Sequence, residues 1–167
     1  MSSTPHPVEP QALRRALGNF ATGVAVITTR DAQQRPIGLT VNSFTSVSLS
    51  PPLVLFCLAR HSVNLPVFQQ ARSFAINVLH SGQGELSRRF ASPVADRFAG
   101  VDWQAGALGD PVIAGAAACF ECEHHDTLER GDHLIFIGQV QHFDQAPVND
   151  PLLYFQGRFR QVAALPA

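Results

Sequence analysis

Short runs of β-branched and aromatic residues, separated by turn-forming residues, recur along this chain and limit most strongly what it can fold into. Such runs are typical of antiparallel strands. They do not alternate regularly with long helices, which disfavours a doubly wound parallel sheet. The pattern predicts a mainly β protein, a small closed or partly closed barrel with peripheral helices. We expect strands over Val24–Thr29, Gly38–Leu49 with an interruption near Asn42-Ser43, Leu53–Ala59, Phe74–Leu79, Ala116–Asp126, His133–Phe143 and Leu152–Arg160.

Helical patterns occupy the segments between some of these strands. Residues Glu9–Phe20 place apolar side chains at helical spacing, and Pro10 suits a first turn. Residues Ser62–Gln70 predict a short helix capped by Ser62 or Asn64, and Gln83–Phe90 predict another. The stretch 92–115, rich in Pro, Gly and Ala, predicts a long surface segment.

The length of 167 residues predicts a single domain over 9–162, with a flexible N-terminal arm over 1–8 and a C-terminal tail over 163–167. Charged residues make up only 15 % of the chain, so we expect part of its surface to be covered in a homo-oligomer. A net charge of −1 gives no electrostatic footprint for nucleic acid or an acidic membrane. The absence of a signal-peptide pattern, of a long apolar run and of a disulfide framework predicts a cytoplasmic protein.

Common nucleotide-binding loops are missing from the sequence. No G-x-G-x-x-G follows a strand, and a P-loop is impossible because the chain has no lysine. Any bound phosphate must therefore be held by Arg, hydroxyls or backbone N–H groups. Cys119-x-x-Cys122 has the spacing of a zinc knuckle, but no turn residue lies between the two cysteines. We interpret them as core residues and predict no metal site.

Uncharged polar residues fill the stretch from Gly38 to Ser50 before a double proline and an apolar run. A half-exposed strand would ordinarily carry charges, so this stretch is a candidate ligand wall. His133 is the second candidate, because Gly131-Asp132 predicts a turn that delivers it to the start of an apolar strand. The alternative is a capping or structural histidine beside a turn, which the sequence alone slightly favours. Gly157, inside a strand pattern, suggests a bulge or a close backbone approach.

Taken together, these motifs resemble the short-chain flavin reductase family, the reductase components of two-component flavin-dependent monooxygenases. The resemblance runs nearly end to end, and the order and spacing of its pieces carry it. The pieces are Phe20-Ala21-Thr22-Gly23-Val24, Ser43-Phe44-x-Ser46-Val47-Ser48-Leu49-x-Pro51-Pro52-Leu53-Val54, Phe74-Ala75-Ile76-Asn77-Val78-Leu79, Leu86-Ser87-x-x-Phe90-Ala91, Gly131-Asp132-His133 and Gly157.

The resemblance implies an FMN-binding split β-barrel, Greek-key-like and homodimeric, with FMN or FAD at the dimer interface and NADH or NADPH as reductant. Reduced flavin would then leave for a partner monooxygenase. His133 and Tyr154 would lie beside the nicotinamide as catalytic residues. Where many relatives place Lys near the flavin phosphates, this chain would rely on Arg60, Arg89 or hydroxyls. The implied flavin-binding residues are Thr40, Val41, Asn42, Ser43, Phe56, Cys57, Leu58, Ser62, Arg89, Phe90, Ala91 and Gly157.

Two other functions remain open at this point. One is a non-enzymatic flavin carrier or sensor built on the same barrel, and the other is a split-barrel oxidase with tightly bound FMN. The choices between FMN and FAD, and between NADH and NADPH, are also open.

Overall fold

The computed structural model describes residues 8–147 and 150–163, so most of the predicted N-terminal arm and C-terminal tail lies outside it. Its main feature is a seven-stranded sheet in which every neighbouring pair is antiparallel. The prediction of a mainly β protein is therefore confirmed. In spatial order the strands are β3 (Pro36–Val41), β2 (Ala25–Arg30), β6 (Ser73–Val78), β9 (Ala118–Arg130), β10 (His133–Gln145), β5 (Pro52–Ala59) and β4 (Thr45–Leu49).

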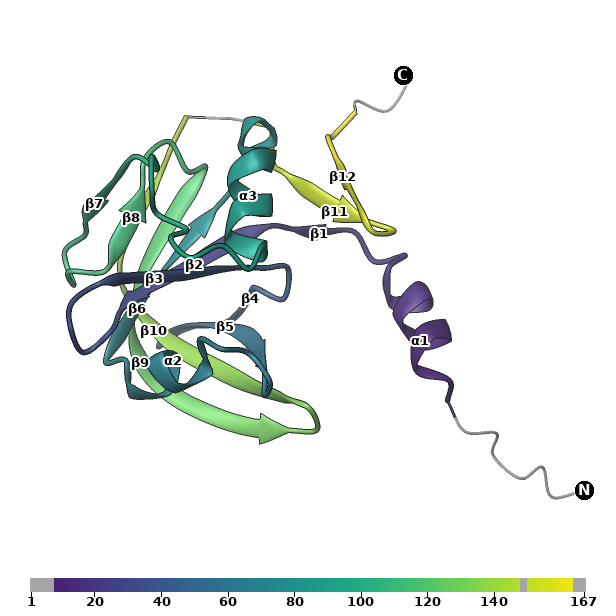
Figure 1. Cartoon of the computed structure of the whole chain (residues 1–167), viewed down its shortest axis with the longest axis horizontal. Helices are drawn as coiled ribbons and strands as arrows, with labels where there is room; N and C mark the ends of the chain where they lie inside the picture. The colour runs from purple at the N-terminus through teal and green to yellow at the C-terminus, as the bar shows by residue number, and fades with distance from the viewer. Residues whose placement is uncertain (1–7, 148–149, 164–167) are drawn as a thin grey trace, which may run out of the picture.

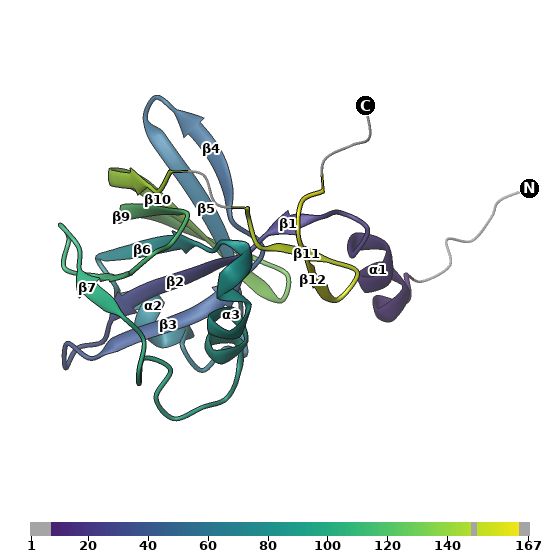
Figure 2. The ribbon, with the colours of Figure 1, turned by 90° about the horizontal axis from the view of Figure 1, so that it is seen from above.

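The sheet curls into a barrel that is open along one side, as Figures 1 and 2 show. Strand β3, at one edge of the sheet, approaches β5 there without pairing with it, and the chain crosses the opening between β3 and β4. The predicted interruption near Asn42-Ser43 is confirmed, because residues 42–44 separate these two strands. This opening is where the chain gathers most of its predicted ligand-binding residues.

Phenylalanine rings fill the inside of the barrel. Phe56 of β5 and Phe136 of β10 stack with ring centroids 5.1 Å apart, and Phe74 meets Phe56 edge-on at the same separation. All three are fully or almost fully buried. Alternate residues of β5 are more exposed, which is the two-residue period of a strand with one face on the core.

Helices and smaller sheets surround the barrel. They are α1 (Pro10–Leu17), α2 (Leu65–Gln70), α3 (Gly84–Ala91), the 3-10 turn η1 (Ser81–Gln83), the two-stranded sheet β7 (Trp103–Ala105) and β8 (Pro111–Ile113), and the three-stranded sheet of β1 (Thr22–Gly23), β11 (Leu153–Phe155) and β12 (Arg158–Arg160). The predicted helices thus occur, with shorter bounds for α1 and α2.

The prediction for residues 92–115 is wrong in part, because this segment is not only surface. It forms β7 and β8 and contributes Phe98 and Ile113 to a second core, where Phe98 meets Phe90 edge-on at 4.9 Å. Strands of three residues are too short for a two-residue period to be recognised in the sequence.

The C-terminal strand pattern also divides differently from the prediction. Gln156 and Gly157 both have positive φ, 48° and 75°, and form the tight turn between β11 and β12. Gly157 therefore makes a hairpin turn and not a bulge. Its position lets the backbone N–H of Gln156 donate to the carbonyl of Gly18 at 2.9 Å, which ties the end of α1 to this hairpin.

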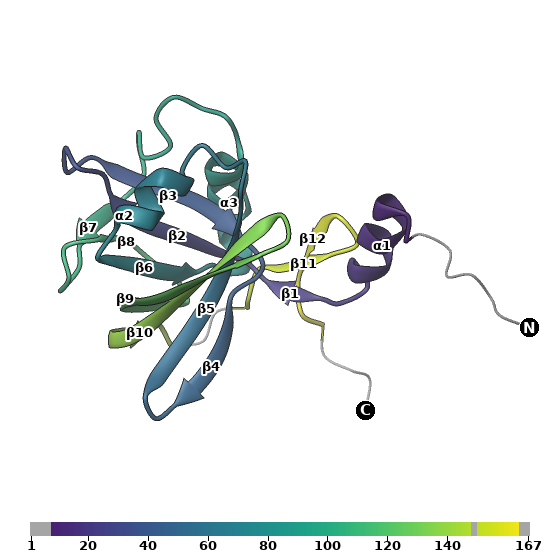
Figure 3. The same ribbon diagram turned by 90° about the horizontal axis from the view of Figure 1, so that it is seen from below.

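Helix α1 and the sheet of β1, β11 and β12 lie to one side of the barrel in all three views (Figures 1–3). No residue of α1 is buried. Leu17 is 65 % exposed and Phe20, just beyond the helix, is 77 % exposed. The apolar positions recognised in the sequence therefore do not pack on this chain's own barrel.

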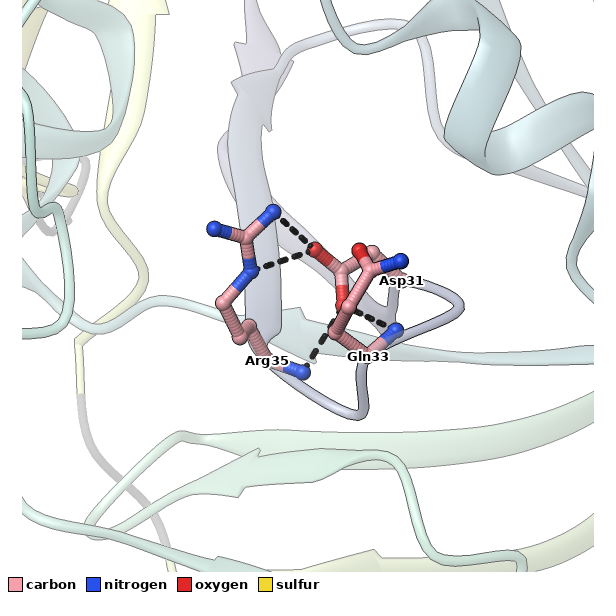
Figure 4. A network of polar contacts seen from close by, with 3 residues as sticks. All are labelled: Asp31, Gln33 and Arg35. Atoms are coloured by element: carbon pink, nitrogen blue, oxygen red, sulfur yellow. Dashed lines mark hydrogen bonds and ion pairs between the residues drawn. The ribbon is translucent and has the colours of Figure 1, made fainter.

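The turn between β2 and β3 is held by one carboxylate, as Figure 4 shows. Asp31 accepts hydrogen bonds from the backbone N–H groups of Gln33 and Arg35, both at 2.9 Å, and forms an ion pair with the Arg35 guanidinium at 2.7 Å. Burial by itself raises the pKa of Asp31, but the hydrogen bonds and the Arg35 charge outweigh it and hold the pKa below the ordinary value of 3.8.

We expect the stability that Asp31 contributes to be lost in acid. Because its pKa is lowered on folding, the contribution is full above the unfolded value of 3.8 and declines as pH falls through the folded value. The difference in unfolding free energy between the wild type and Asp31→Asn should therefore shrink below about pH 4. Denaturant unfolding between pH 7 and pH 3 measures it, with the exposed Asp102→Asn as control. A difference that does not change with pH would contradict the prediction.

Candidate functional site

A hollow of about 440 Å³ lies at the open side of the barrel, bounded by the end of β3, the segment after it, the end of β5 and the end of α3. Most of the residues predicted from the sequence to bind a ligand meet there. They are Thr40, Val41, Asn42, Ser43, Cys57, Leu58, Ser62, Phe90, Ala91 and His133. Elements distant in the sequence are thus joined at one place.

Hydroxyl groups fix the walls of this hollow to each other. Thr40 Oγ1 donates to the carbonyl of Ser87 at 2.7 Å and so ties β3 to α3. Ser43 Oγ accepts from the backbone N–H of Cys57 at 2.9 Å and lies 3.3 Å from the carbonyl of the same residue, to which it donates. The segment that crosses the barrel opening is thereby tethered to β5.

The apolar side of the hollow depends on a close approach between a glycine and a ring. Phe90 is fully buried, and a Cβ at Gly38 would lie only 2.7 Å from its Cε1 atom. A side chain at position 38 would therefore push Phe90 and the end of α3 away from β3. Leu58, 4 % exposed, completes this side.

The rim carries His133, which the Gly131-Asp132 turn places at the first residue of β10, as predicted. Gly131 has the positive φ, 58°, that this turn requires. His133 Nδ1 lies 2.8 Å from Asp132 Oδ1, which leaves Nε2 unengaged by that carboxylate. Hydrogen bonding to His133 and its charge lower the pKa of Asp132.

Positive charge reaches the hollow through a residue that the sequence reasoning did not select. Arg97 lines it and is held by two carbonyls, Nε donating to Ser92 at 3.0 Å and Nη1 to Gly38 at 2.9 Å. Arg60 instead forms an ion pair with Glu129, and Arg89 lines a separate hollow beside α3. Arg97 was missed because it lies in the segment predicted to be surface.

Three further predicted residues lie elsewhere. Phe56 is fully buried in the barrel core. Tyr154 is on β11, opposite Thr22 of β1, with its ring 5.9 Å from that of Phe159. Gly157 is in the adjoining turn. Conversely, the hollow is lined by residues that the sequence reasoning did not name, which are Leu39, Ala59, His61, Val63, Asn64 and Arg97.

The cysteines divide between the core and the hollow. Cys119 and Cys122 are buried, which confirms them as core residues, and burial raises the pKa of each thiol to about 12. Cys57 lines the hollow and is only partly buried, and burial raises its thiol pKa less. Within residues 8–147 and 150–163, no group of three or more His, Cys, Asp or Glu side chains is placed to hold a metal ion.

A larger hollow, about 550 Å³, lies beside the turn of Figure 4 and is lined by Asp31, Arg35 and Asp110 among others. Of its charged side chains, Asp31 and Arg35 pair with each other, whereas Asp110 Oδ2 is buried without a hydrogen-bond partner among the described residues. None of the residues predicted to bind a ligand lines it. The smaller hollow is therefore the better candidate.

The residues that line the smaller hollow restrict the kind of ligand that it can bind. Its polar groups are hydroxyls, two amides, two histidines and one arginine, and no Asp or Glu is among the described residues that line it. Leu39 and Val63 supply accessible apolar surface, and the buried side chains of Leu58 and Phe90 form part of the wall. Such a hollow suits a flat, neutral heteroaromatic ring that carries a hydroxylated and anionic tail.

Comparisons with known proteins agree with this assignment. The model of the flavin reductase like domain family matches residues 17–163. A probable flavin reductase of Rhizobium meliloti is 53 % identical over 84 % of this chain, but the chain spans only about half, 45 %, of that relative's length. The reductase subunit of a flavin-dependent monooxygenase from Mycobacterium tuberculosis is 37 % identical, with 91 % of this chain and 82 % of that protein covered.

A solved structure also resembles this fold closely. The NADH:FAD oxidoreductase of Streptomyces globisporus, in complex with NAD and FAD fragments, superimposes with a TM-score of 0.89 at 43 % identity. The match covers 97 % of this chain and 98 % of that one.

We expect the thiols to react in the order that their burial dictates. In the native protein at pH 8, a thiol reagent such as an aromatic disulfide should modify Cys57 and leave Cys119 and Cys122 unmodified, because buried thiols with raised pKa give little thiolate. Mass spectrometry of the labelled protein identifies the site, and Cys57→Ser is the control. Labelling of Cys119 or Cys122 at the same rate as Cys57 would contradict the structure.

Proposed function

The chain belongs to the flavin reductase like domain family, and from that premise we propose that it is an NAD(P)H:flavin oxidoreductase that supplies reduced FMN or FAD to a partner monooxygenase. The observation that carries the proposal is the hollow at the barrel opening, which combines apolar walls, neutral hydrogen-bonding groups and one arginine with His133 at its rim. The names of the relatives support the same activity and the same class of partner.

The residues present fit a flavin. The segment from Thr40 to Ser43 and the end of β5 offer backbone groups, hydroxyl lone pairs and the Asn42 amide to the polar edge and side chain of the flavin. Leu39 and Val63, which line the hollow and are not buried, offer apolar surface to its ring system. When bound, the flavin accepts a hydride from reduced nicotinamide. The protein's task is to hold the two rings at reacting distance and to exclude water.

His133 is the residue that we assign to the nicotinamide. Asp132 accepts from Nδ1, so Nε2 is free to bind the carboxamide or to hold a proton at the rim of the hollow. The distance of 2.8 Å between the two side chains restricts the orientation of the imidazole ring. His133 thus acts by positioning or proton transfer.

The outer face of β5 and β10 supports a homodimer. Cross-strand pairs on this face join Cys57 to Ile135 and Leu55 to Ile137, side chains that the barrel core does not cover fully. This apolar face leads into the hollow at Cys57. A second copy that packs on it would bury the apolar area and close the hollow on its open side.

In a homodimer, Tyr154 of one subunit could lie at the hollow of the other subunit. Within one chain Tyr154 lies on the sheet of β1, β11 and β12, beside the exposed helix α1, and does not line the hollow. We assign it to the hollow of a partner subunit, where it would lie near the nicotinamide.

A cytoplasmic location completes the proposal, and the three free cysteines support it. None of the described helices is long and apolar enough to span a membrane.

A spectrophotometric assay tests the activity. Oxidation of NADH or NADPH, followed by the loss of its near-ultraviolet absorbance, should be rapid only when free FMN or FAD is added. No oxidation with either flavin would overturn the proposal and favour a flavin carrier or sensor. Oxidation without added flavin, by protein that retains FMN through gel filtration, would favour the tightly bound FMN oxidase.

We expect His133→Ala to reduce kcat/KM for NADH about tenfold or more, the effect of losing a hydrogen bond to the substrate or a proton relay. Flavin affinity, measured by fluorescence quenching, should change less than about twofold. His125→Ala, an exposed histidine of β9 outside the hollow, is the control. Unchanged NADH kinetics in His133→Ala would remove His133 from the mechanism.

We expect Ile137→Glu to convert a dimer into monomers, because a charge on the apolar face of β10 cannot be desolvated at low cost. Light scattering after gel filtration measures the mass, and circular dichroism verifies the fold. Val162→Glu, an exposed valine outside that face, is the control. A wild-type protein that is monomeric at micromolar concentration would contradict the dimer.

A further inference from the structure

A second hollow adjoins the candidate flavin site. Its volume is about 360 Å³, and it lies between the start of β3 and the segment that follows α3. The two hollows share three lining residues, Val63, Asn64 and Arg97. The volume of each lies within the range of about 300–1,000 Å³ typical of ligand pockets. A ligand with two linked halves can therefore occupy both.

Arg97 is located at the junction. Among the described residues that line either hollow it is the only arginine, and the chain has no lysine. Its Nε and Nη1 atoms are fixed by the carbonyls of Ser92 and Gly38, which leaves its other N–H groups for an anion. A guanidinium that is already immobilised loses little further entropy when it binds a phosphate.

The second hollow has the chemistry of a nucleoside pocket. Val63 and Val94 are 84 % and 45 % exposed and line it with apolar surface against which a purine can pack. The side-chain amide of Asn64, which does not cap helix α2, can bond to a base edge. The Asp96 carboxylate accepts from the backbone N–H groups of Phe98 and Ala99 at 2.9 and 3.1 Å. Its charge is thus engaged by its own loop.

We propose that this second hollow binds the adenosine half of a dinucleotide, with the pyrophosphate against Arg97. The proposal rests on the proposed function and deepens it. FAD and NADH both carry a pyrophosphate-linked adenosine, and FAD is the occupant we choose. Its pyrophosphate joins the flavin half to the adenosine half, just as Arg97 joins the flavin hollow to the second one. FAD is then preferred over FMN, which lacks the adenosine.

Binding measurements on the intact protein test this without reference to turnover. Dissociation constants for FAD and FMN come from fluorescence quenching, and those for NADH from calorimetry. Arg97→Gln should weaken FAD and FMN binding alike, about tenfold or more, because the phosphate of FMN corresponds to the first phosphate of FAD and loses the same charged hydrogen bond. Arg72→Gln, an exposed arginine just before β6 that lines neither hollow, is the matched control.

A second variant guards against a structural effect of Arg97→Gln, because Arg97 also bonds to two backbone carbonyls. Val94 is exposed and lines the second hollow but not the flavin hollow, so Val94→Glu leaves the core intact and places a charge where the adenosine would pack. It should weaken FAD binding and leave FMN binding unchanged, and Val162→Glu should affect neither. Circular dichroism and thermal unfolding verify the fold of each variant.

Each outcome decides the matter. Loss of both affinities in Arg97→Gln, together with selective loss of FAD affinity in Val94→Glu, supports the proposal as stated. Loss of NADH affinity with FAD unchanged in Val94→Glu would support an adenosine pocket but overturn the choice of FAD. Equal loss of FAD and FMN affinity in Val94→Glu, or no loss, would overturn the adenosine pocket. Wild-type protein that binds neither flavin would instead overturn the proposed function.

Discussion

Phe56 and Phe136 stack inside the barrel, and the strand register that brings them together also determines where the outer faces of β5 and β10 point. Because side chains alternate across a strand, burying Phe56 directs Cys57 outward to the hollow, and burying Leu134 directs His133 to its rim. A shift of one residue in this pairing would exchange core and site. The aromatic core and the functional face are therefore consequences of one register.

The hydroxyl groups of Thr40 and Ser43, which line the hollow, form hydrogen bonds within the protein. The Thr40 hydroxyl donates a hydrogen bond to the carbonyl of Ser87 in α3, and the Ser43 hydroxyl bonds to both the N–H and the carbonyl of Cys57. What they still offer a ligand is lone pairs, beside backbone groups and the Asn42 amide. Such a wall is rigid but holds a ligand with few strong bonds. This is the arrangement that a reductase needs if its reduced flavin must leave for another protein.

Several features were predictable from local pattern, and others depended on distant contacts. The strand runs and the Gly131-Asp132 turn before His133 are local signals, and the structure has them. Ten residues of the hollow were named through family motifs. In contrast, Arg97 reaches the hollow only through bonds to Gly38 and Ser92, which no periodicity reveals. Tyr154 was placed beside the nicotinamide, although one chain alone puts it on a separate sheet.

The lack of lysine concentrates the recognition of phosphate in one place. A lysine reaches an anion through a flexible stem and a point charge, whereas an arginine can bond to protein carbonyls and still present N–H groups to a ligand. Arg97 bonds to the carbonyls of Gly38 and Ser92, so the position of its guanidinium is set by β3 and by the loop after α3. Because Gly38 has no side chain, Phe90 can also pack directly against β3. The same glycine thus positions the apolar wall and the cation, and the geometry of the site follows from how closely α3 can approach β3.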